Sequence, residues 1–184
     1  MVAGEWVRRL ASRCLVDAQQ DEIRSALGAR NLGDAHSAGA ETMILLARAW
    51  FGRNANKAGK VALRVDAENA HNSIHRAPCL NGAREHLPGM SPWVEWCYTA
   101  PSLLRYGGHL ITAESGLQQG EACASPLWSV GALQLAEGAR QAVRDAGYSL
   151  DLDVAFRDDC LVAGDWEAVA VWWAHITQHG PAST

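Results

Sequence analysis

The order of apolar and polar positions predicts helices and one strand in the first part of the chain. Apolar residues recur with helical spacing in residues 5–27, which end before Gly28, and again in residues 40–52. Residues 60–66, KVALRVD, instead alternate and are rich in β-branched side chains. We therefore expect two helices followed by a strand that ends at Asp66.

The rest of the chain continues with helices, a hairpin and a further pair of strands. Residues 69–87 have a helical pattern that we expect to be interrupted near Pro78. A helix that opens with Ser91-Pro92 precedes two short strands around Gly107-Gly108, which is a hairpin signal. The remaining expected elements are a helix at 125–147 that stops at Gly147, strands at 148–156 and 160–164, and a helix at 165–179 capped by Asp165. Paired strands and packed helices in this mixed order predict an α+β fold.

Composition and length are those of one ordinary globular domain. The chain has 184 residues, of which 48% are hydrophobic and 20% are charged. No apolar run approaches the roughly 18–20 residues needed to cross a bilayer, and the N-terminus lacks the pattern of a secretion signal. The five cysteines are scattered without a CxxC pair, which is typical of reduced thiols. We therefore expect an intracellular protein, cytoplasmic or nuclear, with no membrane partner.

Charge is distributed unevenly along the chain. Residues 1–60 have a net charge of +3, whereas residues 61–184 have a net charge of −7. A basic front and an acidic back suit a nucleic-acid groove beside a metal site. An unevenly charged solvated surface would give the same totals, and both interpretations stay open.

Two adjacent aspartates, Asp158 and Asp159, lie between two apolar runs in the segment VAFRDDCLVAGD, residues 154–165. A tight strand–turn–strand would bury both arms and expose the turn residues 157–159. Adjacent carboxylates repel each other unless a cation offsets them, and Mg²⁺ prefers such oxygen ligands. A plain turn is the alternative, because aspartate is common in turns.

Asp66 strengthens the metal interpretation because it ends a second apolar strand. If the two strands are neighbours, Asp66 and Asp158 converge, and acids from separate strands can bridge two metal ions about 3.5–4 Å apart. Between them, the loop SGLQQGEACASPLW, residues 115–128, has flexible glycines and the amides of Gln118 and Gln119. Such a loop could lie against a base pair, or it could be a simple entry into the following helix.

Three segments in this order resemble the palm motifs of reverse transcriptases, especially those of non-LTR retroelements and group II introns. VALRVDAENAHNSIHR resembles the first motif, SGLQQGEACASPL is similar to the second, and FRDD is similar to the third. The resemblance covers roughly residues 60–165, and the segments before it look like the lower fingers of the same enzymes.

The resemblance implies a right-hand polymerase palm, with an antiparallel sheet, packed helices and partial fingers. Residues 1–59 would be the helical part of the fingers and residues 60–184 the palm, without a thumb. RNA-templated DNA synthesis by two Mg²⁺ ions is the implied activity, with RNA template, DNA primer and dNTP as partners. The implied catalytic and metal-binding residues are Asp66, Asp158 and Asp159. The implied nucleotide- or template-binding residues are Ala67, His71, Gln118, Gln119 and Gly120.

The chain also departs from the pattern of this family. His71 stands where an aromatic ring is usual, and Glu121 stands where the second motif has Asp or Cys. Arg157 precedes the paired acids, and its guanidinium could pair with Asp158 or Asp159 and compete with metal. His71 and His75 could form a metal pair on a helix, although no third ligand has suitable spacing.

The ends of the chain suggest a truncated or decayed copy, with thumb and fingers segments elsewhere in a longer polyprotein. We expect a poor polymerase, because the chain offers few phosphate contacts for a duplex. A non-catalytic nucleic-acid- or protein-binding remnant is one alternative. A metal-dependent phosphohydrolase that uses the same acids is another.

Overall fold

The computed structural model describes residues 6–180, which contain eight helices and five strands. All strand pairs are antiparallel, so the predicted α+β class is confirmed. The chain divides into two units. The first unit combines the segment up to Leu27 with Glu68–Ala132, and the second combines Gly28–Ala67 with the segment from Leu133 onward. The division into fingers and palm at residue 60 stays a prediction.

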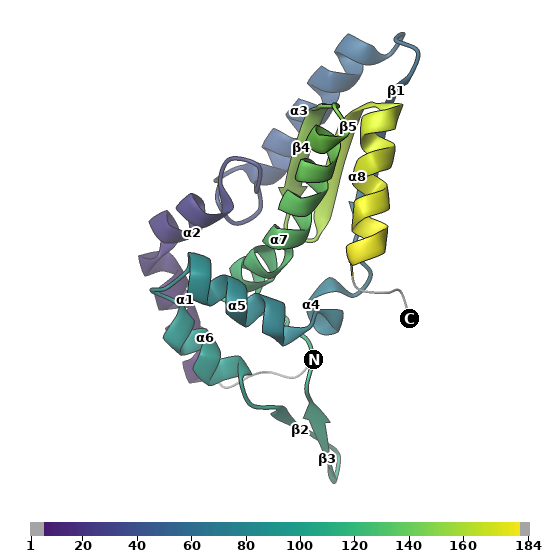
Figure 1. Cartoon of the computed structure of the whole chain (residues 1–184). Coiled ribbons are helices and arrows are strands. Elements are labelled where there is room, and N and C mark those ends of the chain that lie inside the picture. Colours follow the sequence, from purple (N-terminus) through teal and green to yellow (C-terminus); the bar gives the residue numbers. More distant parts are fainter. Residues whose placement is uncertain (1–5, 181–184) are drawn as a thin grey trace. The chain divides into compact units, whose positions relative to one another are not determined.

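The second unit is built on a three-stranded sheet with the order β1–β5–β4 (Figure 1). β1 spans Lys60–Asp66, β4 spans Leu150–Phe156 and β5 spans Asp159–Asp165. β5 lies in the middle and pairs in antiparallel register with both neighbours. Strands that lie far apart in the sequence are therefore adjacent in the sheet, as the metal interpretation requires.

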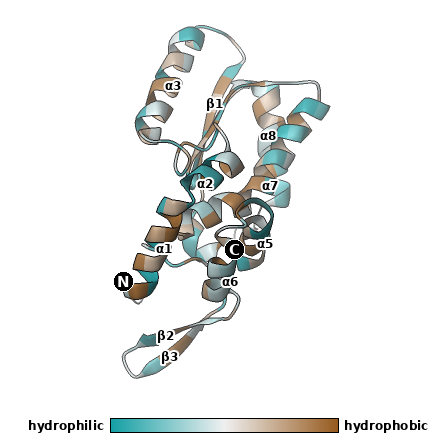
Figure 2. Cartoon of the chain, turned by 90° about the vertical axis from the view of Figure 1, so that its left-hand side faces the viewer, coloured by the Kyte–Doolittle hydropathy of each residue, from teal (hydrophilic) through white to brown (hydrophobic). Residues whose placement is uncertain are grey.

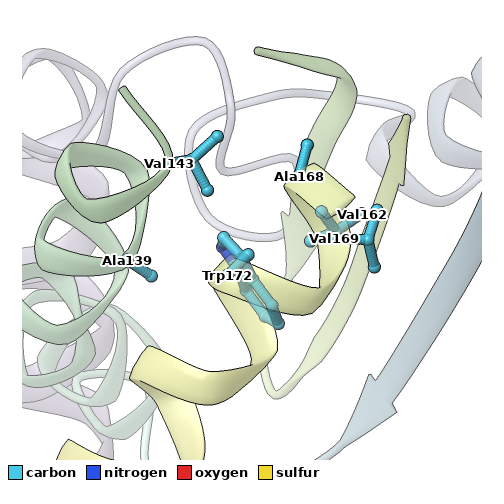
Figure 3. Packing of buried hydrophobic residues seen from close by; sticks show 6 residues of the cluster. All are labelled: Ala139, Val143, Val162, Ala168, Val169 and Trp172. Carbon is cyan, nitrogen blue, oxygen red and sulfur yellow. The ribbon is translucent and has the colours of Figure 1, made fainter. Parts of the chain in front are cut away.

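Helices cover both faces of this sheet. On one face, Met43 and Ala47 of α3 (Gly39–Asn54) pack on a core that contains Val154 and Leu161. The other face is covered by α8 (Trp166–His179) and by the second-unit part of α7 (Ala124–Asp145). Figure 3 shows this second core, which consists of Ala139, Val143, Val162, Ala168, Val169 and Trp172. The helices therefore bury the middle of β5, while Asp66 and Asp165, the last residues of β1 and β5, stay exposed.

The first unit is mostly helical. Its complete helices are α1 (Trp6–Ala18), α2 (Gln20–Leu27), α4 (Ala70–Ser73), α5 (Arg76–His86) and α6 (Ser91–Tyr98), and α7 begins in it. The predicted hairpin is confirmed as β2 (Ser102–Tyr106) and β3 (His109–Ala113), joined by Gly107-Gly108. Leu103, Tyr106 and Leu110 of the hairpin are strongly exposed, and part of β3 is brown in Figure 2.

Two segments that we predicted as helices are interrupted at positions that we did not predict. Residues 5–27 form α1 and α2 with a break at Gln19, and the expected start at Glu5 lies outside the described residues. Residues 69–87 break at Ile74-His75 rather than at Pro78. Pro78 falls in the first turn of α5, where a backbone N–H has no helical acceptor, so its ring does not disturb the helix.

The predicted capping of the last helix by Asp165 also differs from the structure. Asp165 precedes α8 as expected, but its side chain makes no capping hydrogen bond. It pairs instead with the Lys60 ammonium at 3.1 Å, and this ammonium also contacts Asp151 at 3.0 Å. The carboxylate therefore joins the ends of β1 and β5 rather than stabilising the helix terminus.

The structure also describes the state of the cysteines and the length of the helices. All five cysteines are free thiols, and three of them are buried. Within residues 6–180, no helix is both long enough and apolar enough to cross a bilayer.

Candidate functional site

The centre of the candidate site is the end of the sheet where β1 stops and β5 begins. Asp66, the last residue of β1, is directly opposite Asp159, the first residue of β5. Side chains of directly opposite residues point to the same face, with Cβ atoms about 4.5–5.5 Å apart. The sequence led us to expect that Asp66 converges with Asp158. The register confirms that the two strands are neighbours, and it puts Asp159 rather than Asp158 directly opposite Asp66.

Asp158 lies beside this pair, in the turn between β4 and β5. Phe156 is opposite Asp159, so the connection contains only Arg157 and Asp158. The sequence prediction placed Asp159 in the turn as well, which is wrong, because Asp159 already belongs to the β5 ladder. The three acids thus differ in setting: Asp66 and Asp159 are held by a ladder, and Asp158 is held by a two-residue turn.

This turn contains a strained backbone. Arg157 has a φ of 57°, a conformation that costs a non-glycine residue about 1–2 kcal/mol. A positive φ at the first central residue of a two-residue hairpin favours glycine, asparagine or aspartate, so arginine is unusual there. Such strain persists only where the surrounding structure enforces it, and it is enriched at functional sites.

The segment 30–34 supplies that support. The amide of Leu32 donates to the carbonyl oxygen of Ala155 at 2.7 Å, and the amide of Ala155 donates to the carbonyl oxygen of Arg30 at 2.9 Å. Gly33 then passes so close that an added Cβ would lie 2.6 Å from the backbone nitrogen of Arg157. Glycine is therefore required at position 33 for the chain to brace the turn.

From the sequence we gave residues 30–34 no role in the site and so missed this support. A signal was present, because Asn-x-Gly-Asp is typical of a turn held by the asparagine side chain. The Asn31 side-chain oxygen accepts hydrogen bonds from the amides of Gly33 at 3.1 Å and Asp34 at 3.0 Å.

Arg64 is the second residue that sequence reasoning missed. Its Nε and Nη2 donate to the same oxygen of Asp159, at 3.2 and 2.9 Å. The hydrogen bond to Asp159 raises the pKa of Arg64, and the negative charges of Asp159 and, more weakly, Asp66 act in the same direction. Arg64 stands two positions before Asp66 in an alternating strand, so their shared face could have been predicted.

Arg157, which we expected could pair with these acids, has a different neighbour. Its guanidinium lies over the ring of Phe156, 5.6 Å from the ring centroid. The ion pair of Asp159 is made by Arg64. The cation at this end of the sheet therefore comes from β1 and not from the turn.

The donor set at this end consists of carboxylate oxygens, which are the ligands that Mg²⁺ prefers. Asp66 and Asp159 face each other across the ladder, and Asp158 is the next residue. Among residues 6–180, however, no three His, Cys, Asp or Glu side chains are grouped closely enough to hold a metal ion. The chemistry of the acids fits magnesium, while their present arrangement holds a guanidinium.

The histidine pair loses its structural basis. His71 belongs to α4, whereas His75 precedes α5 with an extended backbone. The two imidazoles therefore do not share a helix face, which the suggestion of a metal pair had assumed. His71 instead stacks with Trp128, with ring centroids 6.5 Å apart.

The predicted nucleotide- and template-binding residues fall in two places. Ala67 follows β1 in the second unit, while His71, Gln118, Gln119 and Gly120 belong to the first unit. Within the first unit, the loop before α7 lies along residues 71–74. The amide of Leu117 donates to the carbonyl oxygen of His71 at 2.6 Å, and the amide of Gly116 donates to that of Ile74 at 2.9 Å. These contacts hold Gln118 close to the His71 segment.

A buried polar network anchors the same loop from the other side. The Glu121 carboxylate accepts hydrogen bonds from Arg8 and Ser12, both at 2.7 Å, and from the hydroxyl of Tyr98. The hydroxyl oxygen of Tyr98 in turn accepts the amide of Gln118 at 3.2 Å. Burial and the charge of Glu121 raise the pKa of Tyr98, so the phenol stays protonated and donates to the carboxylate.

Glu121 therefore has a structural explanation. The resemblance led us to expect Asp or Cys at position 121, and the longer glutamate side chain reaches α1 and α6. Arg9 of α1 adds a hydrogen bond to the carbonyl oxygen of Gly120 at 3.1 Å. The loop that carries Gln118, Gln119 and Gly120 is consequently fixed at both ends, which leaves the exposed Gln119 side chain available for contacts.

Comparison of the sequence with protein-family models and with curated proteins finds no match.

Proposed function

We propose that this chain is a reverse-transcriptase-like domain whose activity is RNA-templated DNA synthesis. The observation that carries the proposal is the register that puts Asp66 directly opposite Asp159, beside the turn that contains Asp158. The order of the three sequence segments supports the same proposal, as does the strained, braced turn at Arg157. A palm-like arrangement of the sheet is part of this proposal.

In this proposal, Asp66, Asp158 and Asp159 hold two Mg²⁺ ions. When bound, such ions favour the attack of a primer 3′ hydroxyl and stabilise the leaving oxygen of the nucleotide. The role of the protein is to fix the carboxylates on a rigid sheet end, so that little reorganisation is needed during transfer.

The first-unit residues would contact template and nucleotide. Gln118, Gln119 and Gly120 lie on a loop fixed by Glu121, so their positions would change little on binding. His71 would lie near the nucleotide sugar, and the carbonyl oxygen of Ala67 would add an oxygen ligand for the metal. RNA template, DNA primer and dNTP are the corresponding partners.

Primer extension on an RNA template with Mg²⁺ tests the proposal. We expect wild-type extension to be measurable, and Asp66→Asn and Asp158→Ala to abolish it. Asp145→Asn is the matched control, because Asp145 is an exposed residue of α7 in the same unit. Equal extension by wild type and Asp66→Asn, with both proteins folded by circular dichroism, would rule out this catalytic role.

One observation favours a second candidate, a non-catalytic nucleic-acid- or protein-binding domain. Arg64 already pairs with Asp159, so part of the negative charge at this end of the sheet is offset without a metal ion. RNA binding that is unchanged by EDTA and by Asp66→Asn, together with no primer extension, would favour this candidate. Hydrolysis of a simple phosphodiester without extension would instead indicate the phosphohydrolase alternative.

A further inference from the structure

The position of Arg64 follows from the alternation of β1. Residues two apart on a strand project from the same face, so Arg64 shares a face with Asp66. Asp159 is directly opposite Asp66 and therefore lies on this face too. A long cationic side chain and two carboxylates thus occupy neighbouring places at one end of the sheet.

The contact between Arg64 and Asp159 uses only one of the two carboxylate oxygens of Asp159. Both guanidinium nitrogens donate to a single carboxylate oxygen, Oδ1, so the contact is end-on rather than bidentate. The Arg64 side chain is 69% exposed and that of Asp159 is 32% exposed. The guanidinium can therefore move into water without opening the core, and exposed ion pairs of this kind are weak.

Strand cohesion does not explain this ion pair. β1 and β5 are already paired over seven consecutive residues, from Lys60 opposite Asp165 to Asp66 opposite Asp159. Leu63 and Val65 pack on the buried core of the α7–α8 face, so the strand is also held by apolar contacts. The Arg64 guanidinium instead takes up Oδ1 of Asp159, an oxygen that could otherwise bind a cation.

We propose that Arg64 is an internal counterion that competes with divalent metal for Asp159 and Asp66, and so lowers the metal affinity of this site. The proposal rests on the proposed function, because it takes the same acids as metal ligands. Metal loading then requires the Arg64 side chain to swing away from Asp159. In the absence of metal, the same side chain offsets the repulsion between the two carboxylates.

Mn²⁺ binding tests this inference independently of enzymatic activity. Bound Mn²⁺ is measured by the loss of the electron paramagnetic resonance signal of the free ion. Removing one competing positive charge next to a divalent ion should tighten Mn²⁺ binding about tenfold at low ionic strength. We therefore expect Arg64→Gln to bind Mn²⁺ about tenfold more tightly than wild type, and added salt to reduce the difference.

Arg53→Gln is the matched control, because it removes the same charge from the last turn of α3 in the same unit. Its Mn²⁺ affinity should equal that of wild type. The double variant Arg64→Gln/Asp66→Asn should lose the gained affinity, because it lacks one of the two carboxylates. Circular dichroism checks that each variant is folded.

The outcomes separate this inference from the proposed function. Equal Mn²⁺ binding by wild type and Arg64→Gln overturns the role of Arg64 and leaves the metal site intact. An equal gain in Arg53→Gln also overturns it, because the effect would then be one of net charge. Absence of Mn²⁺ binding in every variant overturns both the metal site of the proposed function and the competition inferred from it.

Discussion

Removal of the Arg140 guanidinium should strongly destabilise the second unit. Arg140 of α7 and Asp153 of β4 form an ion pair in which the two side chains are only 10% and 13% exposed. Deleting one partner of such a pair leaves a buried charge uncompensated, which costs about 3–5 kcal/mol. Arg30 lies 3.7 Å from the same carboxylate and stays in the variant, so it offsets part of this cost. We expect Arg140→Met to lower the free energy of unfolding by about 2–4 kcal/mol.

Urea denaturation followed by circular dichroism measures this loss. Arg144→Met is the matched control, because Arg144 lies one turn further along α7 and its guanidinium donates hydrogen bonds to the exposed Gln141 side chain. Its change should stay within about 0.5 kcal/mol of wild type. Replacing both charges, in Arg140→Met/Asp153→Leu, should recover most of the stability, because a buried ion pair can be exchanged for apolar residues at little cost. A value for Arg140→Met that equals the control would refute the reasoning, since it would mean that the pair is solvated.

Three further predictions concern the core, the pH dependence and the thiols. The Trp172 ring is buried, and its N–H has no hydrogen-bond partner among residues 6–180, so Trp172→Phe should cost about 1–2 kcal/mol and Trp172→Ala about 3–5 kcal/mol in the same urea assay. Burial raises the pKa of Asp151, but hydrogen bonds from Lys60 and Trp50 lower it by more, so the pKa lies below that of an ordinary aspartate. The stability that Asp151 contributes is therefore present above the pKa of this residue in the unfolded chain, and it is lost as pH falls through the pKa in the folded protein. The difference in unfolding free energy between wild type and Asp151→Asn should shrink below about pH 4. Cys14 is exposed, Cys160 is partly buried and the other three cysteines are buried, so a thiol reagent should modify Cys14 first and the three buried thiols only on unfolding, and a rapid reaction of three or more thiols would contradict the described burial.

The hairpin and the long helix show what local sequence can predict. Gly107-Gly108 between two apolar runs allows only a tight reversal, and the structure has a two-residue turn there. Gly147 ends the long helix in a left-handed conformation, with a φ of 78°. In both places the constraint is carried by glycine itself, so no distant contact is needed to decide the structure.

The helix breaks show where local reasoning fails. Helical periodicity continues through Gln19 and through Ile74, and neither position has a glycine or proline that would mark a break. Around Ile74, the carbonyl oxygens of His71 and Ile74 accept amides from the loop at Gly116–Leu117. These acceptors are satisfied by a segment distant in the sequence, so the interruption depends on tertiary contacts.

The candidate site divides in the same way. The sequence alone determined that Asp66 ends an alternating strand and that Asp158 and Asp159 join two apolar ones, because strand periodicity and turn chemistry are local properties. Only the tertiary structure decided that Asp66 lies opposite Asp159, that Arg64 neutralises this pair and that Gly33 braces the turn. The physical reason is that strand register is set by burying both faces of the sheet, under α3 on one side and α7 and α8 on the other.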